Sequence, residues 1–453
     1  MTSPRYIYPA NFSRHIATIL GFPSKQSIAP EYYSAACAEI ITLGTTISAF
    51  EPVRLYARPE DVPTAHSLLE QQLKKLQAAS ASSSSSTPTN VTNANPNNIR
   101  IIPLPTNHLW VRDTGPVYVR SASPAPQQQN QRYAINFRFS EWGRKETVSS
   151  SHGAADGKDW PEMSAAEMRE NAQFASAVIA ADSSPSPVQQ VESSICLEGG
   201  ALVVDGEGTL LATESSILNP NRNPGMSRGE IEAELRRLLG VEKIVWFPGK
   251  RGLDVTDVHV DAEVNFVAPG VVVVSKPWEG APKAWKDVYE EIMEVLGRET
   301  DARGRRFEVH VLQEPAPGVL GELAYEDVAT NYVNFYFVNG GLVVPQFGDR
   351  ERDREALEMC RRTIQRRQRA DERNLAQIGA QPDGNFPGIG VHDRHVGIDG
   401  QLADQGAEEA EDRDLAEVEV TSLDSSDRRR GGGGNSREEG GGGGSDIETH
   451  FDG

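Results

Sequence analysis

The stretch ALVVDGEGTLLAT, from Ala201 to Thr213, consists of two apolar runs joined by the polar turn DGEG. Two short apolar runs on either side of a glycine-containing turn predict a β-hairpin. The same pattern returns at 264–275, at 334–345 and, around a glutamine-rich insertion, at 117–139. A hairpin that recurs along one chain is typical of a modular fold.

Helices and single strands accompany the hairpins. Ser227 and Glu230 form a capping box, which predicts a helix that ends at Gly240, and Lys243–Phe247 has the pattern of a following strand. The same order is predicted for helix 32–50 with strand 52–57 and for helix 285–296 with strand 307–312. The predicted unit is therefore a β-hairpin, a helix and a strand, which places the chain in the α/β class.

Acidic side chains and one histidine stand at the start of three hairpins. They are Asp113 in the segment Trp110–Pro116, Glu198 before two glycines, and His259 with Asp261. If the modules share an axis, their equivalent starts converge, and three carboxylates meet a histidine at one place. Because His259 and Asp261 are two residues apart, we expect them on the same side of a strand.

Each of these residues also has an ordinary structural explanation. Asp113 can be a turn acceptor that pairs with Arg112, and Glu198 can be a solvent-facing charge at a strand end. His259, between two valines, can be a structural core residue. The functional interpretation is favoured because these residues recur at equivalent places in the repeat.

Composition restricts the kind of partner. The 453 residues include 45 Lys and Arg against 65 Asp and Glu, a net charge of −20. This charge argues against binding to nucleic acid or an anionic membrane and favours a small cationic substrate. No apolar stretch is long enough to span a bilayer and no secretory-type run follows the N-terminus, so we expect a cytoplasmic protein. Three scattered cysteines do not suit a disulfide framework or a thiolate zinc site.

The acidic residues are unevenly distributed. Residues 401–453 contain 15 Asp and Glu and 5 Arg, so they carry −10, which is half of the net charge. This glycine-rich composition buries too little apolar area to offset chain entropy. We therefore predict one folded domain over 1–363 and a disordered, low-complexity tail over 364–453. Disordered surface insertions are predicted at 78–98, 121–131 and 182–190.

Several motifs, taken in order, resemble those of the agmatine deiminases and the Porphyromonas-type peptidylarginine deiminases. They are WVRDTGP at 110–116, LEGG at 197–200, LNPNRNP at 218–224, HVD at 259–261 and the stretch 332–349. The resemblance extends from about Tyr6 to about Thr363. It implies the pentein fold, an α/β-propeller of β-hairpin, helix and strand modules around a pseudo-fivefold axis, with the last module matched least well.

The resemblance also implies a hydrolase that converts a guanidinium into a ureido group and ammonia without a metal or cofactor. Asp113, Asp261 and Trp110 are expected to bind the substrate, and Glu198 and His259 to act in catalysis. A planar guanidinium offers five donors to flanking carboxylates, and a histidine can carry the proton for the departing nitrogen. The expected substrate is agmatine, as in putrescine biosynthesis, or free or peptidyl arginine, which would become citrulline.

The family's nucleophile is a cysteine that follows a glycine-rich turn and Ile-His near the C-terminus. Here the match fades after Asp349, and the nearest equivalent places Thr449 at the cysteine position. Cys196, the cysteine nearest in sequence to the site residues, is interpreted as structural. Two explanations stay open: a catalytically inactive guanidinium-binding protein on the same fold, or a chain end foreign to the working enzyme, which the abrupt change to low complexity favours.

Arg138 occupies a position where agmatine deiminases typically have an uncharged residue. It can pair with an α-carboxylate, a group that arginine has and agmatine lacks. Alternatively, it can face the solvent and pair with Glu141. The first arrangement would favour an arginine derivative as the substrate.

Overall fold

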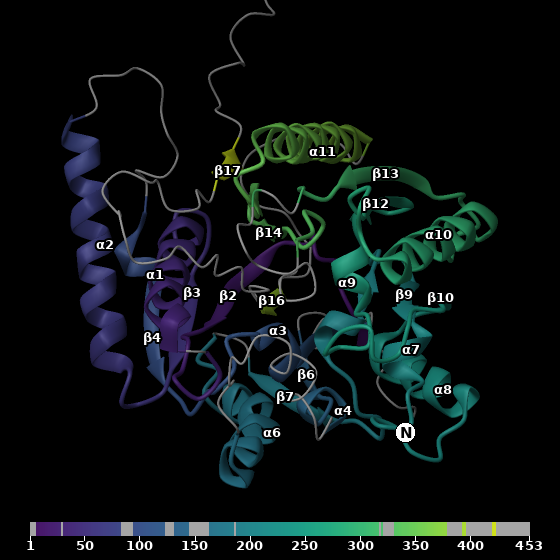
Figure 1. Cartoon of the computed structure of the whole chain (residues 1–453), viewed down its shortest axis with the longest axis horizontal. Coiled ribbons are helices and arrows are strands. Elements are labelled where there is room, and N and C mark those ends of the chain that lie inside the picture. Colours follow the sequence, from purple (N-terminus) through teal and green to yellow (C-terminus); the bar gives the residue numbers. More distant parts are fainter. Residues whose placement is uncertain are drawn as a thin grey trace, which may run out of the picture. The chain divides into compact units, whose positions relative to one another are not determined.

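The computed structural model describes residues 6–28, 30–82, 94–122, 131–144, 163–184, 187–316, 319, 330–377, 392–395 and 419–422. Its strands form five small sheets of three or four strands each. Two one-turn helices lie near the middle of the view, α3 (Val111–Thr114) and α9 (Val260–Glu263) (Figure 1). Longer helices lie toward the periphery: α2 (Val62–Ser82), α6 (Ala165–Ala180), α8 (Arg228–Leu239), α10 (Lys283–Arg298) and α11 (Arg350–Gln377). The chain therefore has the mixed α/β composition that its sequence predicts.

Three modules share one topology, in which a hairpin continues through a helix into a strand parallel to the second hairpin strand. The first contains β5 (Val117–Ser121), β6 (Arg132–Asn136), α6 (Ala165–Ala180) and β7 (Val188–Glu192). The second contains β8 (Val203–Val204), β9 (Thr209–Thr213), α8 (Arg228–Leu239) and β10 (Lys243–Phe247). The third contains β11 (Val264–Ala268), β12 (Val271–Lys276), α10 (Lys283–Arg298) and β13 (Glu308–Gln313). The predicted hairpin, helix and strand unit is confirmed.

The two ends of the domain vary this plan. A parallel sheet contains β2 (His15–Gly21), β3 (Val53–Ala57) and β4 (Ile99–Pro103), connected by α1 (Pro30–Ile47) and α2 (Val62–Ser82). A hairpin of β14 (Tyr336–Val338) and β15 (Gly341–Val344) precedes α11 (Arg350–Gln377). β1 (Tyr6–Ile7) pairs with β5, β16 (His392–His395) with β2, and β17 (Glu419–Ser422) with β15.

Local sequence explains the module that contains β8 and β9. In the turn between these strands, Asp205 Oδ1 accepts hydrogen bonds from the backbone N–H groups of Glu207 (2.8 Å) and Thr209 (2.9 Å). Ser227 and Glu230 form the predicted capping box of α8, and Gly240 ends the helix in the left-handed region at φ 69°. The apolar face of α8 packs into a core cluster with this sheet and the β5–β6 hairpin.

A one-turn helix immediately precedes each of the three hairpins. α3 (Val111–Thr114) leads toward β5, the 3-10 turn η3 (Gly199–Ala201) leads into β8, and α9 (Val260–Glu263) leads into β11. These turns carry or adjoin all four acidic and histidine residues singled out in the sequence. The three modules therefore share the placement of these side chains as well as the topology.

Parts of the segments predicted to be disordered form helices, strands or ion pairs. α2 continues to Ser82, inside the predicted insertion 78–98. In 182–190, Asp182 forms ion pairs with Arg54 and Arg132, and β7 begins at Val188. In the predicted tail, α11 runs to Gln377, and 392–395 and 419–422 form strands. For the strands 392–395 and 419–422, composition is a poor guide because backbone hydrogen bonds to a neighbouring strand need no apolar side chains. Residues 123–130 of the insertion 121–131 and the rest of the tail lie outside the described residues.

Candidate functional site

The four predicted acidic and histidine residues come together at the one-turn helices. Asp113 lies on α3, Glu198 is the N-cap of η3, and His259 is the N-cap of α9, which carries Asp261. The expected strand geometry of His259 and Asp261 is wrong, since His259 is extended and Asp261 is helical. Their side chains reach one place because the chain turns between them.

Gly200 lies where these side chains meet. A Cβ atom at Gly200 would lie 2.5 Å from His259 Nδ1, 2.8 Å from Asp113 Oδ1 and 3.1 Å from Asp261 Oδ2. The backbone N–H of Gly200 donates a hydrogen bond to Asp113 Oδ1 (2.9 Å). Two carboxylates and an imidazole therefore surround a single Cα atom that carries no side chain.

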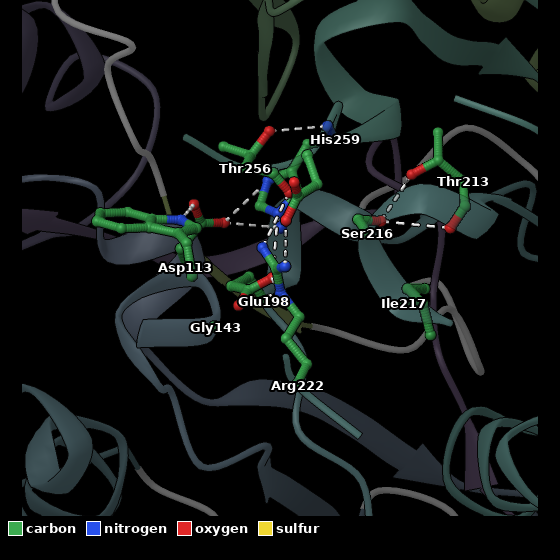
Figure 2. A network of polar contacts seen from close by, with 12 residues as sticks. Asp113, Gly143, Glu198, Thr213, Ser216, Ile217, Arg222, Thr256 and His259 are labelled. Carbon is green, nitrogen blue, oxygen red and sulfur yellow. Dashed lines mark hydrogen bonds and ion pairs between the residues drawn. The ribbon is translucent and has the colours of Figure 1, made fainter. Parts of the chain in front are cut away.

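His259 lies between two carboxylates. Its Nε2 is 3.1 Å from Glu198 Oε2, and its Nδ1 is 3.7 Å from Asp113 Oδ1 (Figure 2). Burial lowers the pKa of His259, but the charges of Asp113, Glu198 and Asp261 outweigh burial and raise the pKa to about 9. The imidazole is therefore protonated at neutral pH and is equipped to donate a proton.

Arg222 holds the Glu198 carboxylate in place. The sequence did not mark it as a site residue. Its Nε lies 2.9 Å from both carboxylate oxygens of Glu198, and its Nη1 donates to Asp257 Oδ2 (2.7 Å) (Figure 2). The Arg222 and Glu198 side chains are fully buried. Burial raises the pKa of Glu198, but Arg222 and His259 outweigh it and lower the pKa below its ordinary value. The only sequence signal for Arg222 was its place in the motif LNPNRNP.

The backbone before His259 is strained and firmly held. Asp257 and Val258 both have left-handed φ values, 63° and 68°, which are unfavourable for a β-branched residue such as valine. Thr213 Oγ1 donates to the Val258 carbonyl (2.6 Å), and Ser215 Oγ donates to the Asp257 carbonyl (2.6 Å). These hydrogen bonds fix the orientation of the backbone just before His259.

Aromatic side chains adjoin Asp113. The indole Nε1 of Trp142 donates to Asp113 Oδ2 (2.9 Å), while the rings of Trp110 and Trp142 meet edge to face with centroids 6.0 Å apart. Trp142 has a left-handed φ of 48°. Trp110, the predicted substrate-binding residue, is half-buried beside it. Trp142 was missed because a tryptophan in an irregular loop has no periodicity that marks it.

Arg112 pairs with Asp261 and not, as the turn explanation of Asp113 expected, with its neighbour in sequence. Its Nε is 3.9 Å from Asp261 Oδ2, and its Nη2 donates to the Leu202 carbonyl (3.0 Å). Burial raises the pKa of Asp261 to about 6, although Arg112 and His259 act in the opposite direction. The pKa of Asp261 therefore lies close to neutral pH.

The three cysteines lie elsewhere. Cys37 and Cys360 are buried in the cores beneath α1 and α11, and burial raises the pKa of each thiol to about 12. The thiol of Cys196 donates to the Arg138 carbonyl (3.2 Å) and contacts Ser140 Oγ (3.1 Å), and burial raises its pKa. Thr449, the predicted occupant of the nucleophile position, lies outside the described residues.

Arg138 faces the solvent and donates to the Ser194 carbonyl (2.7 Å). Glu141 instead bonds to His108 Nε2 (2.7 Å) and to Asn171 Nδ2 (2.7 Å). The predicted pairing of Arg138 with Glu141 is therefore wrong, because the carboxylate already has two buried partners. Within the described ranges, the Arg138 guanidinium forms no hydrogen bond or ion pair with Asp113 or Asp261.

The described part of the chain contains neither a metal-binding group of side chains nor a membrane-spanning helix. Over those ranges, no group of three or more His, Cys, Asp or Glu side chains is arranged to hold a metal ion. Across the same ranges, no helix combines the length and the apolar composition needed to cross a bilayer.

Known proteins are similar to this chain in sequence and in fold. A family model described as Porphyromonas-type peptidyl-arginine deiminase matches residues 7–376. An agmatine deiminase from Medicago truncatula is 34% identical over 295 residues, which cover 61% of this chain and 73% of the relative. The solved agmatine deiminase of Enterococcus faecalis has a TM-score of 0.60 and 22% identity over 87% of this chain and 93% of its own. A C. jejuni agmatine deiminase with substrate bound has a TM-score of 0.57 and 19% identity, over 87% and 91% of the two chains.

Proposed function

The chain belongs to the Porphyromonas-type peptidyl-arginine deiminase family, and we propose that it hydrolyses the guanidinium group of agmatine to give N-carbamoylputrescine and ammonia. The observation that carries this proposal is the meeting of Asp113, Asp261 and His259 around Gly200. Two carboxylates beside a protonated imidazole suit a cation that must be held and then protonated on a departing nitrogen.

Each residue has a distinct role in the proposed reaction. Asp113 and Asp261 accept hydrogen bonds from the planar guanidinium, and Trp110 and Trp142 form the apolar side of the site. Hydrolysis breaks one carbon–nitrogen bond, releases ammonia and puts the oxygen of water on the carbon in its place. Between these steps a nucleophile is bonded to the carbon, and it is released again when water adds. In the resembled family this nucleophile is a cysteine thiolate, and the equivalent position here, Thr449, lies outside the described residues. His259 supplies the proton to the leaving nitrogen and later takes one from water, while Glu198, fixed by Arg222, supports the charged imidazole.

Agmatine suits the site better than arginine. An arginine substrate carries an α-carboxylate that needs a cationic partner, but Arg138 faces the solvent and bonds to the Ser194 carbonyl. Arg112 and Arg222 are paired with Asp261 and Glu198. The relatives named agmatine deiminase support the same choice, and a place in putrescine formation follows from the product.

A second candidate function is guanidinium binding without hydrolysis. It is favoured by the three cysteine thiols, which lie in the apolar cores or bond to Arg138 and Ser140. In this case the carboxylates still hold the cation, but no thiolate attacks it.

The proposal extends to the fold. Three modules of equal topology, the parallel sheet of β2, β3 and β4, and the β14–β15 hairpin amount to five units. We infer that they surround one pseudo-fivefold axis, as the family resemblance implies.

Calorimetry and product analysis test the two candidates together. We expect agmatine to bind at least about tenfold more tightly than putrescine, because a primary ammonium cannot form paired hydrogen bonds with both carboxylates. Formation of N-carbamoylputrescine and ammonia identifies the hydrolase, whereas selective binding without product identifies the inactive alternative. Equal affinity for the two amines would show that the site assignment is wrong.

A further inference from the structure

We propose that Arg112 is a positioning residue that keeps the Asp261 carboxylate charged and available to a guanidinium at neutral pH. The inference rests on the proposed function, because it concerns the affinity of the same site for agmatine. It concerns a residue that the sequence offered only as a turn partner of Asp113.

The geometry directs Arg112 toward Asp261. The two residues lie on different one-turn helices, α3 and α9, and Arg112 Nε is 3.9 Å from Asp261 Oδ2. A hydrogen bond from Nη2 to the Leu202 carbonyl (3.0 Å) fixes the guanidinium of Arg112 from the other side. The buried Nε has no hydrogen-bond partner among the described residues. Arg112 therefore acts on Asp261 mainly through its charge.

Asp261 needs such a neighbour because its other surroundings favour the neutral acid. Burial and the negative charge of Asp113 raise its pKa, and the nearby buried Glu263 is a further acidic neighbour. Arg112, His259 and a backbone hydrogen bond to the carboxylate act in the opposite direction, with Arg112 the largest of the three, and the pKa of Asp261 remains at about 6. Without Arg112, the carboxyl is expected to take up its proton at a higher pH.

Arg112 has two opposing effects on a cationic ligand. Its own positive charge repels a guanidinium, but it also keeps the charged acceptor in place. Asp113, Tyr8 and Tyr336 are the other titratable neighbours of Arg112. Replacement of Arg112 by a neutral residue therefore weakens agmatine binding at low pH, because Asp261 of the variant is then protonated. At high pH the same replacement strengthens agmatine binding, because Asp261 is charged with or without Arg112.

Agmatine affinity measured by calorimetry from pH 5.5 to 8.5 tests this inference on the full chain. Arg112→Gln removes the charge but keeps an amide donor for the Leu202 carbonyl, and Arg112→Lys keeps the charge. For the wild type, the affinity is expected to fall about tenfold per pH unit once the pH drops below about 6. For Arg112→Gln, the same fall should begin at least about one pH unit higher, with affinity equal to or above wild type at pH 8.5. Arg112→Lys should follow the wild type within about threefold.

Other outcomes overturn the inference. An unchanged midpoint in Arg112→Gln, or an equal loss of affinity at every pH, would show that Arg112 does not control the charge of Asp261. If Arg112→Gln does not fold, Arg112→Met replaces it, and failure of both neutral variants beside a folded Arg112→Lys would make the role purely structural. Absence of agmatine binding by the wild type at any pH would instead refute the proposed function.

Discussion

The backbone amide of Gly200 donates to Asp113, and any other residue at this position would add a Cβ atom close to His259. We therefore predict that Gly200→Ala lowers agmatine affinity at least about tenfold, because a displacement of the site side chains by a fraction of an ångström disturbs both carboxylates. Calorimetry measures the affinity, and circular dichroism confirms that the variant is folded.

Gly229 is the matched control for this prediction. It lies in the first turn of α8, and an added Cβ atom would meet nothing within 4 Å. Gly229→Ala should leave the affinity unchanged and raise the free energy of unfolding by about 0.5 kcal/mol. Wild-type affinity in Gly200→Ala would contradict the proposed site.

Substitutions of His259 and Asp261 are predicted to impair different steps, catalysis and substrate binding respectively. Asp261→Asn should mainly weaken agmatine binding, since a neutral amide cannot balance a guanidinium. In a form of the protein that turns over agmatine, His259→Ala should leave binding largely intact and lower kcat by roughly 10²–10⁴-fold. Measurements of kcat, KM and melting temperature separate the two variants, and a near-wild-type kcat in folded His259→Ala would end the proposed mechanism.

At the scale of elements, one carboxylate joins the first parallel sheet to the next module. Asp182, just after α6, pairs with Arg132 on β6 (2.6 Å) and with Arg54 on β3 (3.3 Å), and its side chain is 2% exposed. These guanidinium groups hold the pKa of Asp182 at about 2, against the effect of burial. We predict that Asp182→Asn lowers the free energy of unfolding by about 3–5 kcal/mol, because two buried arginines lose their counter-charge.

An exposed pair on α10 provides the comparison. Lys283 and Asp287 approach to 2.5 Å, but the lysine side chain is 85% exposed. Asp287→Asn should therefore change the free energy of unfolding by less than about 1 kcal/mol. Urea denaturation measures both variants, and similar losses would show that burial of the Asp182 pairs adds nothing.

At the scale of the whole molecule, a buried network joins residues more than 300 positions apart. Glu51 accepts from the Asn339 N–H (2.8 Å) and bonds to His15 Nδ1 (2.9 Å), while the Asn339 side chain bonds to both backbone polar groups of His15 at 2.9 Å. This network fastens the β14–β15 hairpin to the start of β2.

We predict that Asn339→Ala releases that hairpin. The change should lower the free energy of unfolding by about 1–3 kcal/mol, because both side-chain hydrogen bonds of Asn339 are lost and their partners on His15 are left unpaired. Amide hydrogen exchange should become faster in β14 and β15 but stay unchanged in α8, which belongs to another module. Uniformly faster exchange in both regions would argue against a local fastening.

The site also makes the stability of the whole domain depend on pH. The folded-state pKa of His259, about 9, lies above the ordinary value of about 6.5. The stability gained from protonated His259 is therefore complete below about pH 6.5 and is lost as the pH rises through about 9. Urea denaturation at pH 6.5 and pH 9 should show a larger loss for the wild type than for His259→Gln, and equal losses would exclude this contribution.

The sequence alone was sufficient for the local structure and for most of the site. The turn DGEG, the capping box of α8 and the strand Lys243–Phe247 depend on hydrogen bonds and apolar spacing within a few residues, and all appear as predicted. Asp113, Glu198, His259 and Asp261 could be predicted to converge because they recur at equivalent points of a repeated unit. Equivalent points in a repeat acquire equivalent positions in space.

Only the tertiary structure decided which partners these residues have. Arg222 behind Glu198, Trp142 on Asp113 and Arg112 beside Asp261 all depend on contacts between distant segments. The same holds for Arg138, which faces the solvent although its sequence position suggested the site. The charge state of His259 was also undecided by sequence, because burial acts on it in one direction and three carboxylates, two of them from other modules, act in the other. Local spacing determines which way a backbone folds, whereas burial and electrostatics are properties of the surroundings that the complete fold creates.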